Sequence, residues 1–263
     1  MPDSDSGSGA GSDLSSMRAA GEGSGATVLR RPAPEVIVAL DYPEEEAAWG
    51  LVNRLPPGTW CKVGLELFTR CGPGFVKRLA WREHPILLDL KLHDIPTTVA
   101  GAVRSVAGLG VRLLTVHASG GAAMLRAAVE SAQRGSELRI LAVTVLTSLD
   151  DGALADVMGS GVAVEEAVGR LAGLARESGV HGAVASVAEC RAIKLSCGEE
   201  FLVATPGIRL AGDAEHDQKR VARPSVARDA GADFLVVGRS VTGAADPLEA
   251  LRRVRLEAGA QQG

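Results

Sequence analysis

The sequence predicts an α/β protein, a single-domain (β/α)8 TIM barrel, from three observations. Short, almost continuously apolar runs recur along the chain, as in strands that are buried on both faces of a parallel sheet. Amphipathic stretches rich in Ala, Glu and Arg separate these runs, as helices covering such a sheet would. Eight runs can be counted, and eight strand-helix units close a barrel. With 263 residues, 46% of them apolar, the chain can bury such a core as one domain.

The expected strands are spaced so that a helix fits between most of them. They begin near Val36, Trp60, Pro85, Leu113, Arg139, Gly182, Phe201 and Phe234. The stretch PEEEAAWGLVNRL, residues 43–55, is typical of the helices, because a proline and acidic residues are favoured in the first turn. A doubly wound open sheet is the alternative. It is disfavoured because the turn G-x-G-x-x-G is absent after the first strand, where VIVALD leads into YPEEE.

The two ends of the chain differ in composition from the expected barrel. Residues 1–34 are rich in Gly, Ser and Asp and contain few large apolar side chains, so they cannot repay the entropy of ordering. We expect a disordered leader over residues 1–34, the barrel over 35–256 and a frayed tail over 257–263. The leader lacks the apolar segment of a secretory signal.

Composition also narrows the class of partner. The 28 basic and 32 acidic residues give a formal net charge of -4, which provides no basic field for nucleic acid or an anionic membrane. No apolar run is long enough to span a membrane. The four cysteines form no C-x-x-C pair and are expected to be reduced thiols. These features favour a cytoplasmic protein that acts on small molecules.

Charged residues lie near the expected carboxyl ends of three neighbouring strands. Alternation places Asp89 and Lys91 on the same face as Leu87, toward the barrel mouth. Asp41 ends the first strand, and Lys62 lies within the second. Taken singly, such residues are often helix N-caps or lysines that extend to water. Together, charges of alternating sign at the rim where barrel enzymes hold their active sites favour a catalytic field.

The last two expected strands are each followed by a glycine and an arginine. The seventh leads into TPGIR, residues 205–209, and the eighth into VGRSVT, residues 237–242. In barrels these loops commonly bind phosphate through backbone N–H groups and a short helix. Arg239 is the stronger candidate, because a guanidinium can donate two hydrogen bonds to phosphate oxygens. Turn glycines with surface arginines are the structural alternative.

The histidines are interpreted as supporting residues. His117 ends the fourth strand at the rim, where a supporting hydrogen bond is favoured over catalysis, and His93 is read as structural. The remaining three, His84, His181 and His216, are expected at the surface.

Several segments together resemble the signature segments of bacterial orotidine 5′-phosphate decarboxylases. They are VALD, KVGLELF, LLDLKLHDIPTT, VHASGG, AVTVLTS, ATPGIR, DQKR and VVGRSVT. Of these, DLKLHDIP is highly specific. The resemblance implies a homodimer of barrels that converts orotidine 5′-phosphate to uridine 5′-phosphate and carbon dioxide, the final step of de novo pyrimidine nucleotide synthesis, without metal or cofactor.

The resemblance also implies catalytic roles. Lys62, Asp89 and Lys91 would form an alternating charge network, completed by Asp94 of the partner subunit. Asp89 would lie against the substrate carboxylate, and Lys91 would deliver a proton to the ring carbon as carbon dioxide leaves.

Substrate-binding roles follow from the same resemblance. They place Asp41 and Lys62 on ribose hydroxyls, Thr98 of the partner subunit beside Asp94, Thr147 or Ser148 near the pyrimidine, and Arg209, Gln218, Gly238 and Arg239 on the phosphate. The polar stretch LAGDAEHDQKR, residues 210–220, would be a lid, although a solvated loop is the structural alternative.

Two other functions stay open. Related barrels with a D-x-K-x-x-D segment include metal-dependent decarboxylases and aldolases of sugar phosphates, in which a carboxylate at the position of Lys62 helps to hold magnesium. A lysine there repels a divalent cation. A non-catalytic binder of phosphoribosyl ligands would be expected to lack Asp89 or Lys91, and both are present.

Overall fold

The computed structural model describes residues 32–133, 137–158, 161–211 and 221–260. Almost all of the expected leader, the last three residues of the expected tail and most of the expected lid, including Gln218 and His216, lie outside these ranges. The chain divides into residues 1–32 and 33–263, and the second unit forms the fold described below.

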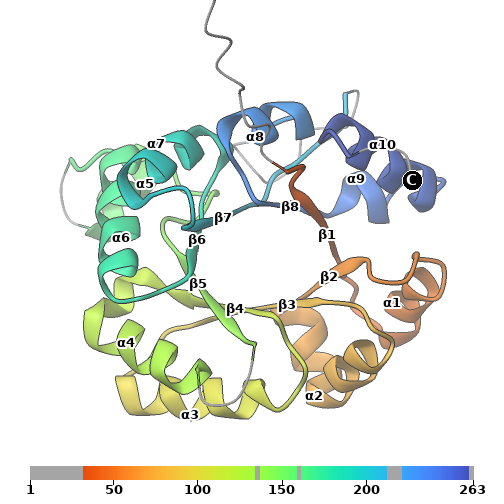
Figure 1. Ribbon diagram of the computed structural model, residues 1–263, viewed down its shortest axis with the longest axis horizontal. Coiled ribbons are helices and arrows are strands. Elements are labelled where there is room, and N and C mark those ends of the chain that lie inside the picture. Colours follow the sequence, from red (N-terminus) through yellow and green to blue (C-terminus); the bar gives the residue numbers. More distant parts are fainter. Residues whose placement is uncertain (1–31, 134–136, 159–160, 212–220, 261–263) are drawn as a thin grey trace, which may run out of the picture. The chain divides into compact units, whose positions relative to one another are not determined.

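Within the described residues, eight parallel strands form a closed barrel, as the sequence predicts (Figure 1). Each strand pairs with its neighbours in sequence, and β8 pairs with β1 to close the sheet. The strands are β1 (Glu35–Ala39), β2 (Trp60–Gly64), β3 (Ile86–Leu92), β4 (Leu113–His117), β5 (Arg139–Val143), β6 (Gly182–Val184), β7 (Leu202–Thr205) and β8 (Phe234–Val237). The expected strand starts are confirmed to within one residue.

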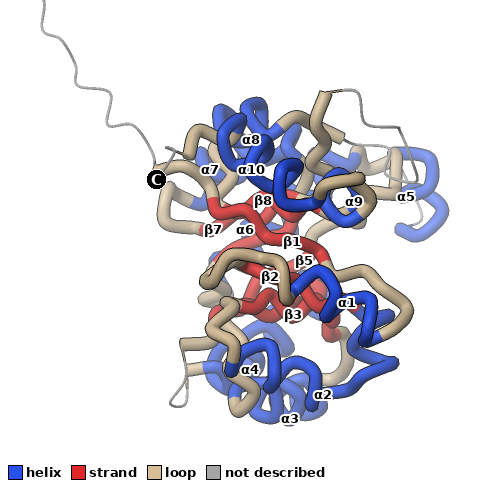
Figure 2. The backbone as a smooth tube through the Cα atoms, turned by 90° about the vertical axis from the view of Figure 1, so that its right-hand side faces the viewer, coloured by secondary structure: helices blue, strands red, loops and turns tan. Residues whose placement is uncertain are grey.

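Helices surround the strands as an outer layer (Figures 1 and 2). They are α1 (Glu45–Val52), α2 (Leu65–Trp81), α3 (Pro96–Ala107), the 3-10 turn η1 (Ala118–Gly120), α4 (Gly121–Ala132), α5 (Asp151–Met158), α6 (Val164–Glu177), α7 (Val187–Cys197), α8 (Pro224–Ala230), α9 (Arg239–Thr242) and α10 (Pro247–Glu257). Glu45 and Glu46 occupy the first turn of α1, where negative charge stabilises a helix. In the described part of the chain, no helix is long and apolar enough to cross a membrane.

Alternating residues of the strands belong to two separate hydrophobic cores. Outward side chains such as Val38, Leu88 and Leu114 pack against the helices in one large cluster. Inward side chains form a smaller cluster inside the barrel, made of Ile37, Ala39, Leu87, Leu113, Leu141, Ala204, Phe234 and Val236. Complete burial of an aliphatic side chain contributes about 1.5–3 kcal/mol, so both clusters stabilise the barrel. Polar residues nearer the C-terminal ends of the strands line the mouth of the barrel.

Two of the histidines expected at the surface lie elsewhere. The side chain of His84 is buried, and its Nδ1 lies 2.9 Å from the carbonyl oxygen of Thr59. His181 is half-buried, and its Nδ1 accepts a hydrogen bond from the backbone N–H of Ile140. Both expectations were wrong because a polar residue before a strand was read as solvated, whereas each ring binds a backbone group of a neighbouring strand or loop. All four cysteines are free thiols, as expected.

Candidate active site

A cavity of about 480 Å³ opens at the C-terminal ends of the strands. All eight strands, or the segments that directly follow them, contribute to its lining. Its walls combine charged residues from β1 to β3, apolar residues from β5 and β6, and glycines and arginines after β7 and β8. Such a lining, in which charged and polar groups converge beside apolar walls, suits a polar small molecule.

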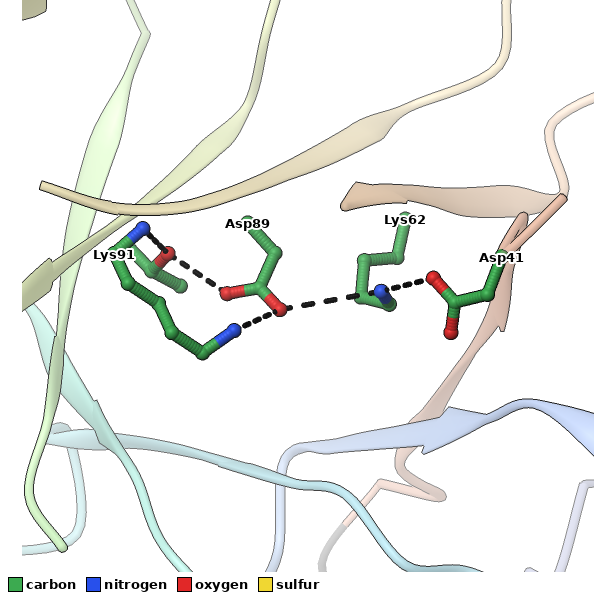
Figure 3. A network of polar contacts seen from close by, with 5 residues as sticks. Asp41, Lys62, Asp89 and Lys91 are labelled. Carbon is green, nitrogen blue, oxygen red and sulfur yellow. Dashed lines mark hydrogen bonds and ion pairs between the residues drawn. The ribbon is translucent and has the colours of Figure 1, made fainter. Parts of the chain in front are cut away.

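A row of charged side chains with alternating sign follows one wall of this cavity: Asp41, Lys62, Asp89 and Lys91 (Figure 3). The Nζ atom of Lys62 lies 2.7 Å from Oδ1 of Asp41 and 3.9 Å from Oδ2 of Asp89. The Nζ atom of Lys91 lies 2.6 Å from the same Oδ2. Each ammonium therefore faces a carboxylate, which offsets the cost of burying these charges.

Exposure differs along the row. The side chains of Lys62 and Asp89 are 11% and 15% exposed, whereas those of Lys91 and Asp41 are 28% and 56% exposed. The middle of the row is thus fixed within the protein, and Lys91 reaches the open part of the cavity.

The protonation state of Asp89 follows from its neighbours. Burial raises the pKa of this carboxyl, but the charges of Lys91 and Lys62 and hydrogen bonds from Lys91 and Thr115 together bring the pKa below its ordinary value. Asp89 is therefore an ionised carboxylate at neutral pH.

Gly64 leaves space for the row. A Cβ atom at this position would lie 2.8 Å from Nζ of Lys62 and 3.1 Å from Oδ1 of Asp41. A larger residue would therefore displace the Lys62–Asp41 pair. The segment KVG of the sequence contains this glycine, but sequence reasoning did not single it out.

Strand β3 is irregular where it carries its two charged residues. The flanking ladder pairs are Leu88 with Leu114 and Leu92 with Val116. Between them, the β3 residues 89–91 stand opposite a single β4 residue, Thr115. Lys91 has a φ of 49°, in the left-handed region that costs a residue with a side chain about 1–2 kcal/mol. Bulges of this kind redirect side chains next to active sites.

Glycine and arginine residues after the last two strands line another part of the cavity. They are Gly207 and Arg209 after β7, and Gly238 and Arg239 after β8. Gly207 has a φ of 81°, which only glycine adopts readily. The hydroxyl of Ser240 donates to the carbonyl oxygen of Ile208 at 3.3 Å and ties the two loops together. The two guanidinium groups give this part of the cavity the positive charge that a phosphate requires.

Thr147 and Ser148, the two candidates that the sequence left open, lie in the loop after β5. Thr147 is half-buried and lines the cavity, together with Val143, Val145 and Leu146. Ser148 is exposed and is not part of the lining. Thr147 is therefore better placed to contact a ligand.

Other expected site residues are not brought together within one chain. Asp94, two residues before α3, and Thr98, in its first turn, are exposed and do not line the cavity. Oδ1 of Asp94 instead accepts a hydrogen bond from the N–H of Ile95 at 2.6 Å. Gln218 lies outside the described residues.

Sequence reasoning also missed Thr115 and Thr242, both of which line the cavity. Alternation along β4 could have found the first, because Leu113 belongs to the inner core and Leu114 to the outer core.

His117 stands beside the charged row but is not part of the cavity lining. Its ring centroid lies 5.4 Å from that of His93. Burial, then His93 and Lys91, lower the pKa of His117, against an opposing effect of Asp89. A neutral imidazole at this place suits the supporting role that the sequence predicts.

Comparison with known proteins agrees with this geometry. The protein-family model described as "Orotidine 5'-phosphate decarboxylase / HUMPS family" matches residues 34–254. A relative from Nitrosococcus oceani named orotidine 5′-phosphate decarboxylase is 50% identical over 224 residues, which are 84% of this chain and 96% of that protein. One of the same name from Thermobifida fusca is 52% identical over 217 residues, 82% of this chain and 91% of the relative.

Solved structures are similar over the same region. The orotidine 5′-phosphate decarboxylase of Lactobacillus acidophilus superposes with a TM-score of 0.77 at 35% identity, covering 86% of this chain and all of that chain. The enzyme of that name from Pyrococcus horikoshii OT3 gives a TM-score of 0.67 at 25% identity, with the same coverage.

Proposed function

The chain belongs to the orotidine 5′-phosphate decarboxylase / HUMPS family, and from this premise we propose that it is a carboxy-lyase that converts orotidine 5′-phosphate to uridine 5′-phosphate and carbon dioxide. The observation that carries the proposal is the alternating row from Asp41 to Lys91 in a cavity that also holds two glycine-arginine loops. Such a cavity suits a ligand with a phosphate at one end and a reacting carboxylate at the other. The product would feed pyrimidine nucleotide synthesis.

Lys91 is the proposed proton donor. The bond between ring carbon C6 and the carboxylate breaks, carbon dioxide leaves, and the electron pair stays on C6. A proton then passes from Nζ of Lys91 to C6, and solvent later returns a proton to the neutral amine. Positive charge fixed beside the atom where negative charge develops lowers the barrier. Lys91 contacts Asp89 and is partly exposed to the cavity, and both features support this role.

Asp89 is the proposed neighbour of the substrate carboxylate. The low pKa of Asp89 keeps it ionised, so two carboxylates would face each other in the bound complex. Their repulsion is relieved when one of them leaves as a neutral gas. Lys62, between Asp41 and Asp89, holds the row together and limits this repulsion to the reacting end.

The remaining contacts are assigned by the resemblance and supported by the cavity lining. Asp41 and Lys62 would bind the ribose hydroxyls and Thr147 the pyrimidine, while Gly238 and the guanidinium groups of Arg209 and Arg239 would bind the phosphate. Gln218 is assigned to the phosphate by the resemblance alone.

The second subunit of a homodimer would complete the site. The partner subunit's Asp94 would extend the charged row beyond Lys91, and the partner subunit's Thr98 would lie beside that acid. Exposure of both positions in the single chain is compatible with a contact across an interface.

We further infer that the reaction needs neither metal nor cofactor and takes place in the cytoplasm. A divalent cation at Asp89 would meet the ammonium groups of Lys62 at 3.9 Å and Lys91 at 2.6 Å from Oδ2. Coulomb repulsion between like charges at such distances disfavours metal binding. Lys91 also supplies the positive charge that a cofactor would otherwise provide.

The test follows the ultraviolet absorbance of orotidine 5′-phosphate in the presence of a chelator. We expect the wild-type chain to decarboxylate it at the same rate with and without EDTA. Loss of activity in EDTA that added Mg²⁺ restores would point instead to a metal-dependent lyase, and absence of turnover in either condition would refute the proposed reaction.

The equivalent assay of Lys91→Ala should show a loss of roughly 10²–10⁴-fold in kcat. As matched control, Lys77→Ala changes an exposed lysine on α2 and should leave kcat unchanged.

A further inference from the structure

Thr115 is a fully buried polar residue in the barrel wall. It lies on β4 between Leu114 and Val116, which both belong to the outer core. Its side chain therefore points to the barrel interior, where it lines the cavity. A buried hydroxyl is costly unless it forms hydrogen bonds, so its partners show what it does.

Both partners of this hydroxyl belong to the irregular part of β3. The backbone N–H of Lys91 donates to Oγ1 of Thr115 at 2.9 Å, and Oγ1 lies 2.8 Å from Oδ1 of Asp89. An amide N–H only donates and an ionised carboxylate only accepts. The hydroxyl proton must therefore point to Asp89.

The bond from Thr115 separates the roles of the two carboxylate oxygens of Asp89. Oδ1 accepts from Thr115, while Oδ2 faces the ammonium groups of Lys91 and Lys62. The hydroxyl thereby fixes the rotation of the carboxylate group. That rotation sets where Nζ of Lys91 is held.

The same hydroxyl supports the backbone of Lys91. No ladder pair with β4 forms over residues 89–91, and Lys91 has a positive φ that residues with a side chain rarely adopt. Its N–H finds a side-chain acceptor where a regular strand would offer a carbonyl. An aliphatic residue at position 115 would leave this amide and one oxygen of Asp89 without that partner.

We propose that Thr115 is a positioning residue that orients Asp89 and Lys91 together for proton delivery. The proposal rests on the proposed decarboxylation, because that reaction gives these two groups their task. Thr115 itself does not exchange a proton with the substrate.

The test compares two substitutions in the full-length chain. Thr115→Val removes the hydroxyl and keeps the shape, whereas Thr115→Ser keeps the hydroxyl and removes a methyl group. We expect Thr115→Val to lower kcat roughly 10- to 100-fold, as for loss of a hydrogen bond to a charged group, with a smaller effect on KM. Thr115→Ser should retain most of the wild-type kcat.

A pH profile separates positioning from packing. Loss of the hydroxyl removes one group that lowers the pKa of Asp89, so the acidic limb of kcat/KM should move to higher pH in Thr115→Val and not in Thr115→Ser. The other groups facing Asp89 are Lys91 and Lys62, with His117 nearby on β4, and both variants keep them. Asp41 beyond Lys62 and His93 beside His117 are also unchanged.

Thr205→Val is the matched control. Thr205 is also a fully buried strand threonine, but its Oγ1 lies 3.2 Å from Sγ of Cys190 on α7, on the helix side of β7. We expect this variant to lose a similar amount of thermal stability while keeping the kcat and pH profile of the wild type.

A crystal structure of Thr115→Val distinguishes failure of this proposal from failure of the proposed reaction. We expect a rotated Asp89 carboxylate or a changed φ at Lys91, and this readout holds even if the wild type does not act on orotidine 5′-phosphate. An unchanged site with unchanged kcat and pH profile would overturn the proposal, as would an equal loss in Thr115→Ser. If Thr115→Val does not fold, Thr115→Ala provides the same test.

Discussion

Lys91 combines an ion pair with an uncommon backbone conformation. Its ammonium lies 2.6 Å from Asp89, two residues earlier in the same strand, and its φ is 49°. In a regular strand, residues two apart point the same way but stand several ångströms from each other. Their contact lies at the irregular part of β3, next to the cavity, and such local strain is typical of functional sites.

His117 provides a prediction on pH and stability at this scale. Burial, followed by His93 and Lys91, lowers the pKa of His117 below its ordinary value of 6.5. The unfolded chain therefore binds the proton first as pH falls. The stability that the neutral ring contributes is complete above pH 6.5 and is lost as pH falls from there through the lowered pKa.

Urea denaturation measures this effect. The wild type should lose more unfolding free energy than His117→Asn between about pH 7.5 and about pH 5.5, because only the wild type carries the titrating ring. Equal losses in both proteins would show that His117 does not titrate differently in the folded and unfolded states.

Single residues show where prediction from the sequence succeeds and fails. Asp89 and Lys91 were assigned to the barrel mouth because strand alternation is a local property, and both line the cavity in the structure. The same alternation applies to Thr115, which was missed because a threonine in an apolar strand carries no charge to draw attention. The φ of Lys91 depends on unequal numbers of residues in two strands, and no local pattern in β3 encodes it.

At the scale of elements, the loops after β7 and β8 form one unit. Ser240, at the start of α9, binds the carbonyl oxygen of Ile208 after β7. Arg209 in turn donates its backbone N–H to the carbonyl oxygen of Ala222 at 2.9 Å, which fixes the loop on its other side. The two arginines are thus presented by a connected framework rather than by independent loops.

Arg239→Ala should weaken binding far more than chemistry. Removing a forked, charge-assisted contact should raise KM roughly 10- to 100-fold. Arg239→Lys, which keeps the charge but loses the forked geometry, should fall between the wild type and Arg239→Ala. Steady-state kinetics with orotidine 5′-phosphate measure both.

The exposed Arg253 on α10 offers the control for this prediction. Arg253→Ala should keep the wild-type KM. If Arg239→Ala has the same KM as Arg253→Ala, the phosphate does not bind at the loop after β8.

Element boundaries were predictable because turn signals and apolar runs lie next to each other in the sequence. Every expected strand start agrees with the structure within one residue. The buried place of His84 was not predictable in this way, since its partner, the carbonyl oxygen of Thr59, lies 25 positions earlier. Contacts between loops depend on barrel closure, which single elements do not reveal.

For the whole molecule, closure of the barrel is what assembles the site. Pairing of β1 with β8 brings the first and last strands together, so Asp41 and Arg239 line the same cavity. A ligand that contacts both would span the seam of the barrel (Figure 1). The proposed contribution of a second subunit would extend this assembly beyond one chain.

Mixed dimers test the proposed shared site. Lys91→Ala and Asp94→Ala should each be strongly impaired alone, but a mixed dimer would contain one intact site. Random mixing of a symmetric dimer should then restore about one quarter of wild-type activity. Mixing Lys91→Ala with Asp89→Asn is the control, because both changes damage the same subunit's part of the site and no intact site can form.

Failure of the first mixture, in heterodimers shown to have formed, would contradict sharing. In that case the role of Asp94 would be to accept the hydrogen bond from the backbone N–H of Ile95. Contacts of this kind between subunits cannot be worked out from the sequence pattern of one chain, and only the resemblance suggests them.

The central claim is that the alternating charges hold the ammonium of Lys91 at the carbon that loses carbon dioxide. A crystal structure of the full-length protein with uridine 5′-phosphate tests it most directly. We predict that Nζ of Lys91 points to C6 of the pyrimidine at about 3–3.5 Å, with the phosphate at Arg239. A bound nucleotide with Nζ of Lys91 turned into bulk solvent would contradict the account.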